Sequence, residues 1–416
     1  MRGAELAWLL SFSDPELGVG WNPRASRLSR WRLGRTRALL RLAGDPQLGM
    51  RVVLIAGTKG KGSTAAFLAS IAHVSGSRAG LFTSPHLQDY RERVRVDGAM
   101  LAPATFDRAI GQLRPLVTRF RRAHPGAGEP TTFELTLVLA LQTFAVRRCA
   151  VAILEVGLGG RLDATNALDP AISIITPVSY DHTAILGRSL ATIATEKAGI
   201  VRRGRPALVA VQRSAAARAI AKVCREEGAE LEVVRPLKGT VDLALDGDHQ
   251  RQNAALAVAA ARVLELSAVA PGLRSAAWPA RYELVPGHPP IVLDGAHNGA
   301  SAVALARQLR RDRAGRRLVL VVGINRDKDA RAVLAPLVRS ASTVIATRSA
   351  SPRAADPVWL AQAAGPKARP ADTVAMAIAM ARADAGPHGF VSVTGSLALA
   401  GEARTALGLA PEERLW

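Results

Sequence analysis

The chain has 416 residues, of which 49% are hydrophobic and 21% charged, a composition that is ordinary for a globular protein. Its apolar runs are too short to cross a bilayer, its N-terminus lacks a signal-peptide pattern, and its two cysteines exclude a disulfide framework or a cysteine-based metal site. We therefore expect a cytoplasmic protein of two or three domains with no membrane partner.

The net charge of +21 raises the question of nucleic-acid binding. Basic residues are scattered singly along the chain, and aromatic residues, which could stack on bases, make up only 4%. We therefore expect no nucleic-acid partner, and a positive field also suits anionic nucleotides and carboxylates. Only seven of the basic residues are lysines. Where arginine is the default cation, a lysine indicates a role that arginine cannot fill. The lysines that lie in the motifs below are Lys59, Lys61, Lys197 and Lys328.

Short apolar strands alternate with helical patterns along the first part of the chain, which predicts a mostly parallel α/β sheet. Residues 51–56 have the pattern of a buried strand, and residues 65–74 that of a helix closed by Gly76. Further strands are expected to end at Thr83, Glu155, Thr176 and Val211.

A second series of strands predicts a second α/β domain at the C-terminal end. Its strands are expected at residues 291–293, 318–322, 343–347 and 390–394. Residues 266–279 contain Pro271, Gly272 and Pro279, and are the predicted hinge. The predicted domains are therefore residues 1–272 and residues 273–416.

A glycine-rich loop, Gly57–Ser63, follows the first strand and leads into a helix. Glycines allow backbone N–H groups to approach phosphate oxygens, and the helix N-terminus adds its dipole. Lys61 can reach the β- and γ-phosphates, and Ser63 can contact a metal-bound oxygen. The loop departs from the standard phosphate-loop pattern, since Ile55 replaces its first glycine and Gly62 follows the lysine. A glycine-rich turn without a ligand is the simpler alternative.

Polar residues follow three of the predicted strands at the edge where the phosphate loop lies. Glu155 ends one strand, Asp181-His182 follows another, and Thr83-Ser84 ends a third. Ligands of open α/β sheets bind beyond the carboxyl ends of the strands. A carboxylate, an imidazole and a hydroxyl at that edge favour Mg²⁺, which takes few protein ligands. A single such residue would more often cap a helix or lie in the core.

These motifs resemble the folylpolyglutamate synthase / dihydrofolate synthase family, part of the Mur ligase superfamily. The resemblance runs in order from about Trp31 to Arg404, and its most specific segment is Leu154–Asn166. The other matching segments are Gly57–Ser63, Thr83–Leu87, Asp181–Thr183, Glu196–Ile200, Trp278–Arg281, Leu293–Asn298, Asp327–Asp329 and Gly395–Leu397. The family implies a P-loop ATPase domain followed by a smaller Rossmann-like domain, with the reaction in the cleft between them.

The resemblance also implies roles for individual residues. ATP would be bound by Thr58, Lys59, Gly60, Lys61, Gly62, Ser63, Asn253, Arg281 and Asp294. Magnesium would be bound by Ser84, Glu155, His182 and Lys197, the last as a carbamate that binds or positions a second ion. The pterin site would be lined by Thr131, Thr132, Leu162, Asp163 and Ala164. Lys61, Lys197 and His182 would act in catalysis.

Three departures from the family pattern bear on these roles. Lys59 replaces the usual asparagine of the phosphate loop, and Gly299 replaces the usual proline after Asn298. The N-terminal motif that borders the pterin appears here as residues 31–35. The substrate is therefore less firmly indicated than the ATP chemistry.

The reaction implied is ATP-dependent addition of L-glutamate to dihydropteroate, to folates, or to both, by a monomeric enzyme. The substrate carboxylate would attack the γ-phosphate, and the amine of glutamate would attack the resulting acyl phosphate. Two alternatives remain. A sister ligase could act on a cell-wall or other peptide precursor, and a P-loop ATPase could act on nucleic acid, which would predict salt-sensitive binding.

Overall fold

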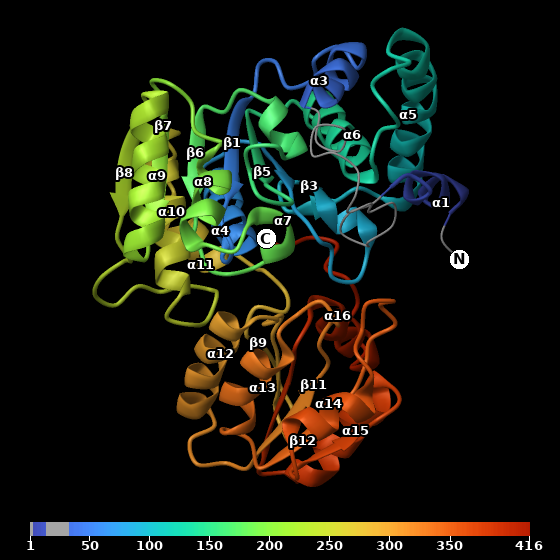
Figure 1. Ribbon diagram of the computed structural model, residues 1–416, viewed down its shortest axis with the longest axis vertical. Coiled ribbons are helices and arrows are strands. Elements are labelled where there is room, and N and C mark those ends of the chain that lie inside the picture. Colours follow the sequence, from blue (N-terminus) through green and yellow to red (C-terminus); the bar gives the residue numbers. More distant parts are fainter. Residues whose placement is uncertain (1–2, 14–32) are drawn as a thin grey trace.

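The computed structural model describes residues 3–13 and 33–416 (Figure 1). Residues 31 and 32 of the N-terminal motif lie outside the described residues. The described chain forms two α/β domains, each built on one sheet (Figure 1). None of the described helices is both long enough and apolar enough to span a membrane.

The first sheet has eight strands in the order β4-β3-β2-β5-β1-β6-β7-β8, and is parallel from β2 to β8. The strands are β1 (Arg51–Ala56), β2 (Ala79–Phe82), β3 (Val94–Val96), β4 (Ala99–Met100), β5 (Val151–Glu155), β6 (Ile172–Ile175), β7 (Pro206–Ala210) and β8 (Glu230–Val234). The central strands are apolar on both faces because helices cover both sides, as is usual in parallel sheets.

Helices cover this sheet in two layers, and alternate residues of β1 show the division. Val52 and Leu54 face the first layer, whereas Val53 and Ile55 face the second. The first layer contains α1 (Ala4–Leu10), α3 (Leu33–Leu42), α5 (Pro103–Ala123), α6 (Thr132–Val146), α7 (Thr183–Leu186), α8 (Leu190–Ala198) and α9 (Ser214–Glu227). The second contains α4 (Lys61–Val74), α10 (Gln250–Val263) and α11 (Val269–Ser275).

The second sheet has six strands in the order β13-β12-β11-β14-β10-β9, with only β9 antiparallel. The strands are β9 (Glu283–Val285), β10 (Ile291–Leu293), β11 (Leu318–Val322), β12 (Thr343–Ala346), β13 (Ala368–Pro370) and β14 (Phe390–Thr394). One face packs against α12 (Gly299–Asp312), α13 (Ala330–Val338) and α14 (Pro357–Ala364), the other against α15 (Val374–Ala385) and α16 (Leu397–Ala406). The predicted second α/β domain is thus confirmed.

Half of the predicted hinge is wrong, because residues 269–275 form the helix α11. Pro271 lies in the first turn, where its missing N–H costs no hydrogen bond. Gly272 lets α11 approach α4, since a Cβ there would lie 2.4 Å from the Cα of Ile71. The Ser70 hydroxyl donates to the Gly272 carbonyl at 2.8 Å. The connection between the sheets is therefore confined to residues 276–282.

Strand register sets where the polar residues meet. β1 lies between β5 and β6, with Ile55 opposite Glu155 and Ala56 opposite Ile175. The phosphate loop therefore begins beside Glu155 on one side and beside Thr176 on the other. The sequence prediction that these strand ends share one edge is confirmed.

Candidate active site

The phosphate loop turns sharply between β1 and α4. Gly57 and Gly60 adopt φ values of 144° and 84°, which residues with a side chain rarely adopt. A Cβ on Gly57 would lie 1.8 Å from the Thr176 hydroxyl oxygen. The helix begins at Lys61, four residues before the predicted start, so its N-terminal N–H groups and its dipole lie within the loop. The loop thus has the form of an anion cradle.

Two residues from distant segments lie directly on this loop, which explains its unusual glycines. A Cβ on Gly60 would lie 2.1 Å from the amide oxygen of Asn253, at the start of α10. A Cβ on Gly62 would lie 2.8 Å from the indole nitrogen of Trp278, in the connection between the domains. Glycine rather than a larger residue follows Lys61 because the Trp278 ring occupies that space. The predicted placement of Asn253 next to the nucleotide loop agrees with this geometry.

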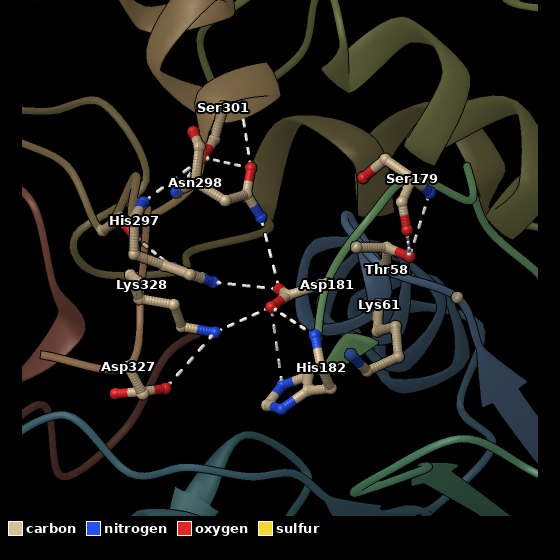
Figure 2. A network of polar contacts seen from close by, with 12 residues as sticks. Thr58, Lys61, Ser179, Asp181, His182, His297, Asn298, Ser301, Asp327 and Lys328 are labelled. Atoms are coloured by element: carbon tan, nitrogen blue, oxygen red, sulfur yellow. Dashed lines mark hydrogen bonds and ion pairs between the residues drawn. The ribbon is translucent and has the colours of Figure 1, made fainter. Parts of the chain in front are cut away.

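Other residues of the loop are fixed by the neighbouring chain. The Thr58 hydroxyl donates to the carbonyl of Ser179 at 3.1 Å and accepts from its N–H at 3.1 Å (Figure 2). Ser63 is buried in the first turn of α4. Lys59 extends into a buried position where its ammonium has no hydrogen-bond partner among the described residues. Burial lowers the pKa of Lys59 to about 8, although the nearby charge of Asp181 opposes the shift.

Lys61, Glu155 and Ser84 form one group at the sheet edge. The Lys61 ammonium lies 3.6 Å from a carboxylate oxygen of Glu155, and the Ser84 N–H donates to the other oxygen at 3.4 Å. Glu155 is buried because it ends the central strand β5. A lysine and a carboxylate placed beside a phosphate cradle can hold a triphosphate and its metal ion.

Lys197 reaches the same loop from α8. Its side chain is buried and donates to the Gly57 carbonyl at 2.8 Å. Burial, with a further contribution from the charge of Lys61, lowers the pKa of Lys197 to about 7. Close to neutral pH the side chain is therefore divided between ammonium and neutral amine, the form that can react with carbon dioxide.

Asp181 joins the first domain to the second at the open end of this site (Figure 2). It accepts from the Lys328 ammonium at 2.7 Å and the Asn298 amide at 3.3 Å, and lies 3.7 Å from His297 Nε2. Burial alone would raise the pKa of Asp181, but His297, His182 and Lys328 hold it well below its usual range. We call Asp181, His297, Asn298 and Lys328 the Asp181 cluster.

His182 precedes α7 with a left-handed backbone, φ 50°, and extends beside Asp181 (Figure 2). Desolvation in the cleft, opposed by Asp181 and assisted by Lys328, Lys197 and Lys61, lowers the pKa of His182 to about 4. The imidazole is therefore neutral at physiological pH, as a metal ligand or proton acceptor must be.

The second domain contributes Arg281 and Asp294 near the connection. Asp294 follows β10 and accepts from the backbone N–H groups of Tyr282 at 2.9 Å and Ala296 at 2.8 Å. Burial lowers the pKa of Arg281, while the charges of Asp294 and Glu155 oppose the shift. Arg281 thus lies close enough to carboxylates of both domains to interact with their charges, as expected of a residue in a shared nucleotide site.

The residues predicted for the magnesium site are only partly assembled. Within residues 3–13 and 33–416, no three His, Cys, Asp or Glu side chains lie close enough to hold a metal ion by themselves. Glu155 and Ser84 are adjacent, Lys197 lies across the phosphate loop, and His182 lies next to Asp181. One buried carboxylate with a hydroxyl still fits Mg²⁺, which keeps waters and takes phosphate oxygens from its nucleotide. The arrangement suits an ion that arrives with ATP.

The residues predicted for the pterin site lie together, but their polar atoms have structural partners. Thr131 caps α6 in a capping box with Glu134, and the Thr132 hydroxyl donates to the carbonyls of Leu9 and Phe12 at 3.1 Å. Asp163 accepts from Leu158 N at 2.9 Å and caps the short helix Ala164–Ala167. The hydrogen bonds of these side chains therefore fix the start of α6 and the loop after β5.

Two further contacts bring the pterin segments together. A Cβ on Gly157 would lie 2.8 Å from the Phe133 ring and 3.3 Å from Asp163, so α6 meets the loop that contains Leu162 and Ala164. Arg35, from the N-terminal motif, donates to the buried Glu134 carboxylate at 2.9 Å. Arg35, the last residue of the N-terminal motif, thus forms a buried ion pair with Glu134 of α6.

Sequence reasoning gave no role to Asp181, Asn298, Lys328 or Trp278, although all four lie in matching motifs. One signal pointed to Lys328, namely the scarcity of lysine. Four of the seven lysines lie around this site. The charge of Asp181 acts on the pKa of both Lys59 and Lys197. Lys61 forms an ion pair with Glu155, and Lys328 forms one with Asp181. The position of Trp278 depends on tertiary packing that no sequence spacing encodes.

Comparison with protein families and relatives is consistent with this geometry. The Mur ligase middle domain family matches residues 55–235, and the Mur ligase glutamate ligase domain family matches residues 280–397. The dihydrofolate synthase/folylpolyglutamate synthase of Mycobacterium tuberculosis is 35% identical over 91% of each chain. The Bacillus subtilis protein of the same name is 34% identical over 71% of this chain and 76% of its own.

Solved structures with similar folds carry nucleotides. M. tuberculosis folylpolyglutamate synthase complexed with ADP has a TM-score of 0.87 at 32% identity, covering 98% of this chain and all of the other, 100%. Escherichia coli FolC in complex with DHPP and ADP has a TM-score of 0.84 at 30% identity, covering 98% of both chains. The Yersinia pestis enzyme complexed with AMPPNP and Mn ion has a TM-score of 0.84 at 31% identity, also covering 98% of both. The chain belongs to the folylpolyglutamate synthase / dihydrofolate synthase family of Mur ligases.

Proposed function

We propose that this chain is an ATP- and magnesium-dependent ligase that joins L-glutamate to the carboxylate of a pterin substrate, either dihydropteroate or a folate. The observation that carries the proposal is the position of the phosphate loop. Lys61 and Glu155 of the first domain lie opposite Arg281 and Asp294 of the second, so one nucleotide could contact both. The names of the relatives support a pterin substrate over a cell-wall precursor.

The chain's own residues account for most of the chemistry. The loop N–H groups and Lys61 bind the β- and γ-phosphates and stabilise the charge that develops as the γ-phosphate is transferred. Glu155, Ser84 and His182 would hold Mg²⁺, which when bound neutralises phosphate charge. The substrate carboxylate becomes an acyl phosphate that the amine of glutamate attacks. The Asp181 cluster closes the cleft and excludes water from this intermediate.

Lys197 is proposed to act as a carbamate. As an ammonium it would lie in a buried site beside Lys61, where like charges repel. A carbamate carries a negative charge and oxygen atoms, which complement Lys61 and suit a hard cation. The pKa of about 7 supports the proposal, because the neutral amine needed for carbamylation is available at neutral pH.

Three further features belong to this proposal. The domains divide within residues 276–282, after α11 and before β9. The enzyme acts as a monomer without nucleic acid, which is supported by a site whose two halves come from one chain. It acts in the cytoplasm, which is supported by two buried cysteines that are both free.

The test uses purified protein with ATP, Mg²⁺, glutamate and each pterin in turn, with mass spectrometry of the amide product. We expect product with dihydropteroate, with a reduced folate, or with both, and matching release of phosphate. A nucleotide-sugar peptide serves as the control substrate. Product with that peptide and none with any pterin would overturn the proposal.

A further inference from the structure

The chain after α16 turns back to the first domain. The Met100 N–H donates to the Glu413 carbonyl at 2.8 Å, and the Leu415 N–H donates to the Gly98 carbonyl at 3.1 Å. These bonds add the chain end to the edge strand β4 through an Ala99–Arg414 bridge. A Cβ on Gly98 would lie 2.8 Å from the Trp416 ring. Residues 410–416, here called the tail, thus connect the second domain to the first a second time.

Arg404 of α16 lies at the centre of this connection. It is only 1% exposed, so its guanidinium must find acceptors within the protein. It donates to Gln88 of the first domain at 2.8 Å, and to Glu412 at 2.9 Å and the Ala410 carbonyl at 3.1 Å in the tail. It also pairs with Glu283 at the start of the second sheet. One side chain therefore joins three separate segments.

The segment held by Arg404 is the loop that begins with Ser84. The Gln88 amide also donates to the Thr405 hydroxyl at 3.0 Å and the Leu409 carbonyl at 2.9 Å. A Cβ on Gly401 would lie 2.2 Å from the Leu87 carbonyl oxygen, so only glycine lets α16 contact the loop backbone. The second domain thus packs directly on the loop of residues 84–92.

The loop is rigid from within as well. Glu92 accepts from the N–H groups of Leu87 at 2.7 Å, Gln88 at 2.9 Å and Asp89 at 2.9 Å. These bonds tie residues 87–89 to Glu92, and Ser84 lies three residues before the first of them. A displacement at Gln88 would therefore move this part of the loop and, through the connected backbone, the position of Ser84. The Ser84 N–H contacts Glu155 at 3.4 Å, so that displacement would also change the surroundings of the buried carboxylate.

We propose that Arg404 and the tail position the loop of residues 84–92, and through it the Ser84 hydroxyl, for metal binding. This inference rests on the proposed function, in which Ser84 and Glu155 bind magnesium. Arg404 and the tail hydrogen-bond to the loop, to β4 and to Glu283, and are positioning elements. They lie beyond residue 397, where the match to the Mur ligase glutamate ligase domain family ends. The reason for such a device is that a serine hydroxyl is a weak ligand, and its affinity depends on being held in place.

The experiment compares the full chain with variants that release the loop in steps. The variants are deletion of residues 410–416, Arg404→Lys, Arg404→Ala and Gln88→Ala. Gln88→Ala removes only the partner of Arg404 in the first domain and leaves the tail in place. This variant therefore tests the proposal even where the deletion variant fails to fold. Arg369→Ala is the matched control, because Arg369 makes an ion pair with Asp384 that is distant from the loop.

Hydrogen exchange tests the positioning itself. We expect faster amide exchange in residues 84–92 for the deletion, Arg404→Ala and Gln88→Ala, and unchanged exchange in the phosphate loop. Arg404→Lys should be intermediate, because lysine keeps the charge but cannot reach all the acceptors of a guanidinium. Unchanged exchange in residues 84–92 would overturn the proposal.

Binding of Mn²⁺ as a probe, followed by electron paramagnetic resonance in the presence of ADP, tests the consequence. We expect affinity to fall roughly 10–100-fold in the deletion and in Arg404→Ala, with metal-free ADP affinity unchanged and Arg369→Ala like wild type. A loop that exchanges faster while Mn²⁺ affinity stays the same would overturn the inference, as would wild-type protein that binds no Mn²⁺. Normal Mn²⁺ binding without glutamate ligation would count against the proposed substrate alone.

Discussion

Two of the places where the domains meet are built differently. The Asp181 cluster joins them through side chains alone, with Lys328, Asn298 and His297 of the second domain around one carboxylate of the first. The tail joins them through backbone bonds to β4 and through the buried Arg404. The first contact faces the proposed nucleotide site, and the second lies behind the Ser84 loop.

This difference indicates which contact can open during a reaction. Water and substrate groups can replace side-chain contacts between charges, and salt weakens them where they reach solvent. Separating the tail from the first domain would break its backbone bonds to β4 and the bond from the buried Arg404 to Gln88, and the loss of each bond costs about 0.5–3 kcal/mol. We therefore expect the domains to open at the Asp181 cluster while residues 276–282 and the tail serve as the pivot. Substitutions at four positions, 61, 197, 181 and 59, can break or sharpen this comparison.

The largest effect is expected from Lys61→Ala, at the base of the side that opens. The substitution removes the charge that holds the γ-phosphate, so we expect kcat to fall by about 10²–10³-fold or more. The fold should persist, since Lys61 lies at a helix start and is partly exposed. Lys222→Ala is the matched control, because Lys222 pairs only with Glu226 on the exposed face of α9. Turnover like wild type in Lys61→Ala would refute the assignment of the phosphate loop.

Lys197 comes next, because it lies beneath the same loop. We expect Lys197→Ala and Lys197→Arg to lose roughly 10–100-fold in metal-dependent activity. Arginine should not rescue, since a guanidinium keeps its charge and forms no carbamate. NMR with ¹³C-labelled bicarbonate should show a carbamate that disappears in both variants. In the wild-type protein the carbamate signal should also be lost as the pH falls below about 7, where the ammonium form of Lys197 dominates. An active Arg variant would show that only a cation is needed.

Asp181→Asn tests the opening contact directly. The amide keeps the shape but leaves Lys328, whose side chain is 12% exposed, with the longer ion pair to Asp327 at 3.9 Å in place of the contact to Asp181 at 2.7 Å. We expect kcat/KM to fall about tenfold, equivalent to roughly 1.4 kcal/mol of transition-state stabilisation. Wild-type activity should decline with ionic strength, whereas exchange protection of residues 84–92 should not. A double-mutant cycle with Lys328→Met should show strong coupling. Additive effects would mean that the two side chains do not act as a pair.

Sequence patterns predicted the elements whose signals are local. Buried parallel strands appear as continuous apolar runs, so β1, β10, β11 and β14 were predicted at their observed bounds, and β5 was predicted to end at Glu155, as it does. The antiparallel edge strands β3, β4 and β9 were missed because each has only two or three residues. The hinge was misplaced because Pro271 and Gly272 usually interrupt helices, whereas here their positions allow α11 to form and pack.

The residues of the candidate site also fall into two groups, those with a local signal in the sequence and those without one. Residues that follow strands, such as Glu155, were predictable because strand ends meet at one sheet edge. The Asp181 cluster, Trp278 and Arg404 were not predictable, because each depends on how one domain docks on the other. The low number of lysines was the one signal that connected the two domains, because it singled out Lys328 of the second domain together with Lys59, Lys61 and Lys197 of the first.

Substitution of Lys59 should give the smallest effect. It should raise the stability of the protein and weaken its binding of nucleotide. Burial lowers its pKa from 10.5 to about 8, so the unfolded chain binds more protons than the folded chain between those values. Stability should therefore rise with pH across that window, and the penalty of the buried charge is fully present below pH 8. Lys59→Asn, which restores the family's usual residue, and Lys59→Met remove this penalty. We expect either variant to be more stable at neutral pH by about 1 kcal/mol, a value reduced for solvent screening, and its stability to lack the alkaline rise.

Nucleotide binding should change in the other direction. The Lys59 ammonium has no hydrogen-bond partner among the described residues, and it lies at the third position of the phosphate loop. A bound phosphate would supply the missing acceptor, so the variants should bind ATP more weakly by a factor of about five, equivalent to roughly 1 kcal/mol. Urea unfolding and ATP titration on both sides of pH 8 would measure the two effects on the same protein. A variant that is less stable at neutral pH, with ATP affinity unchanged, would place Lys59 with the tail among the residues that hold the structure together. A gain in stability with a loss of affinity would instead place it on the side that opens, where a buried charge is kept for its ligand.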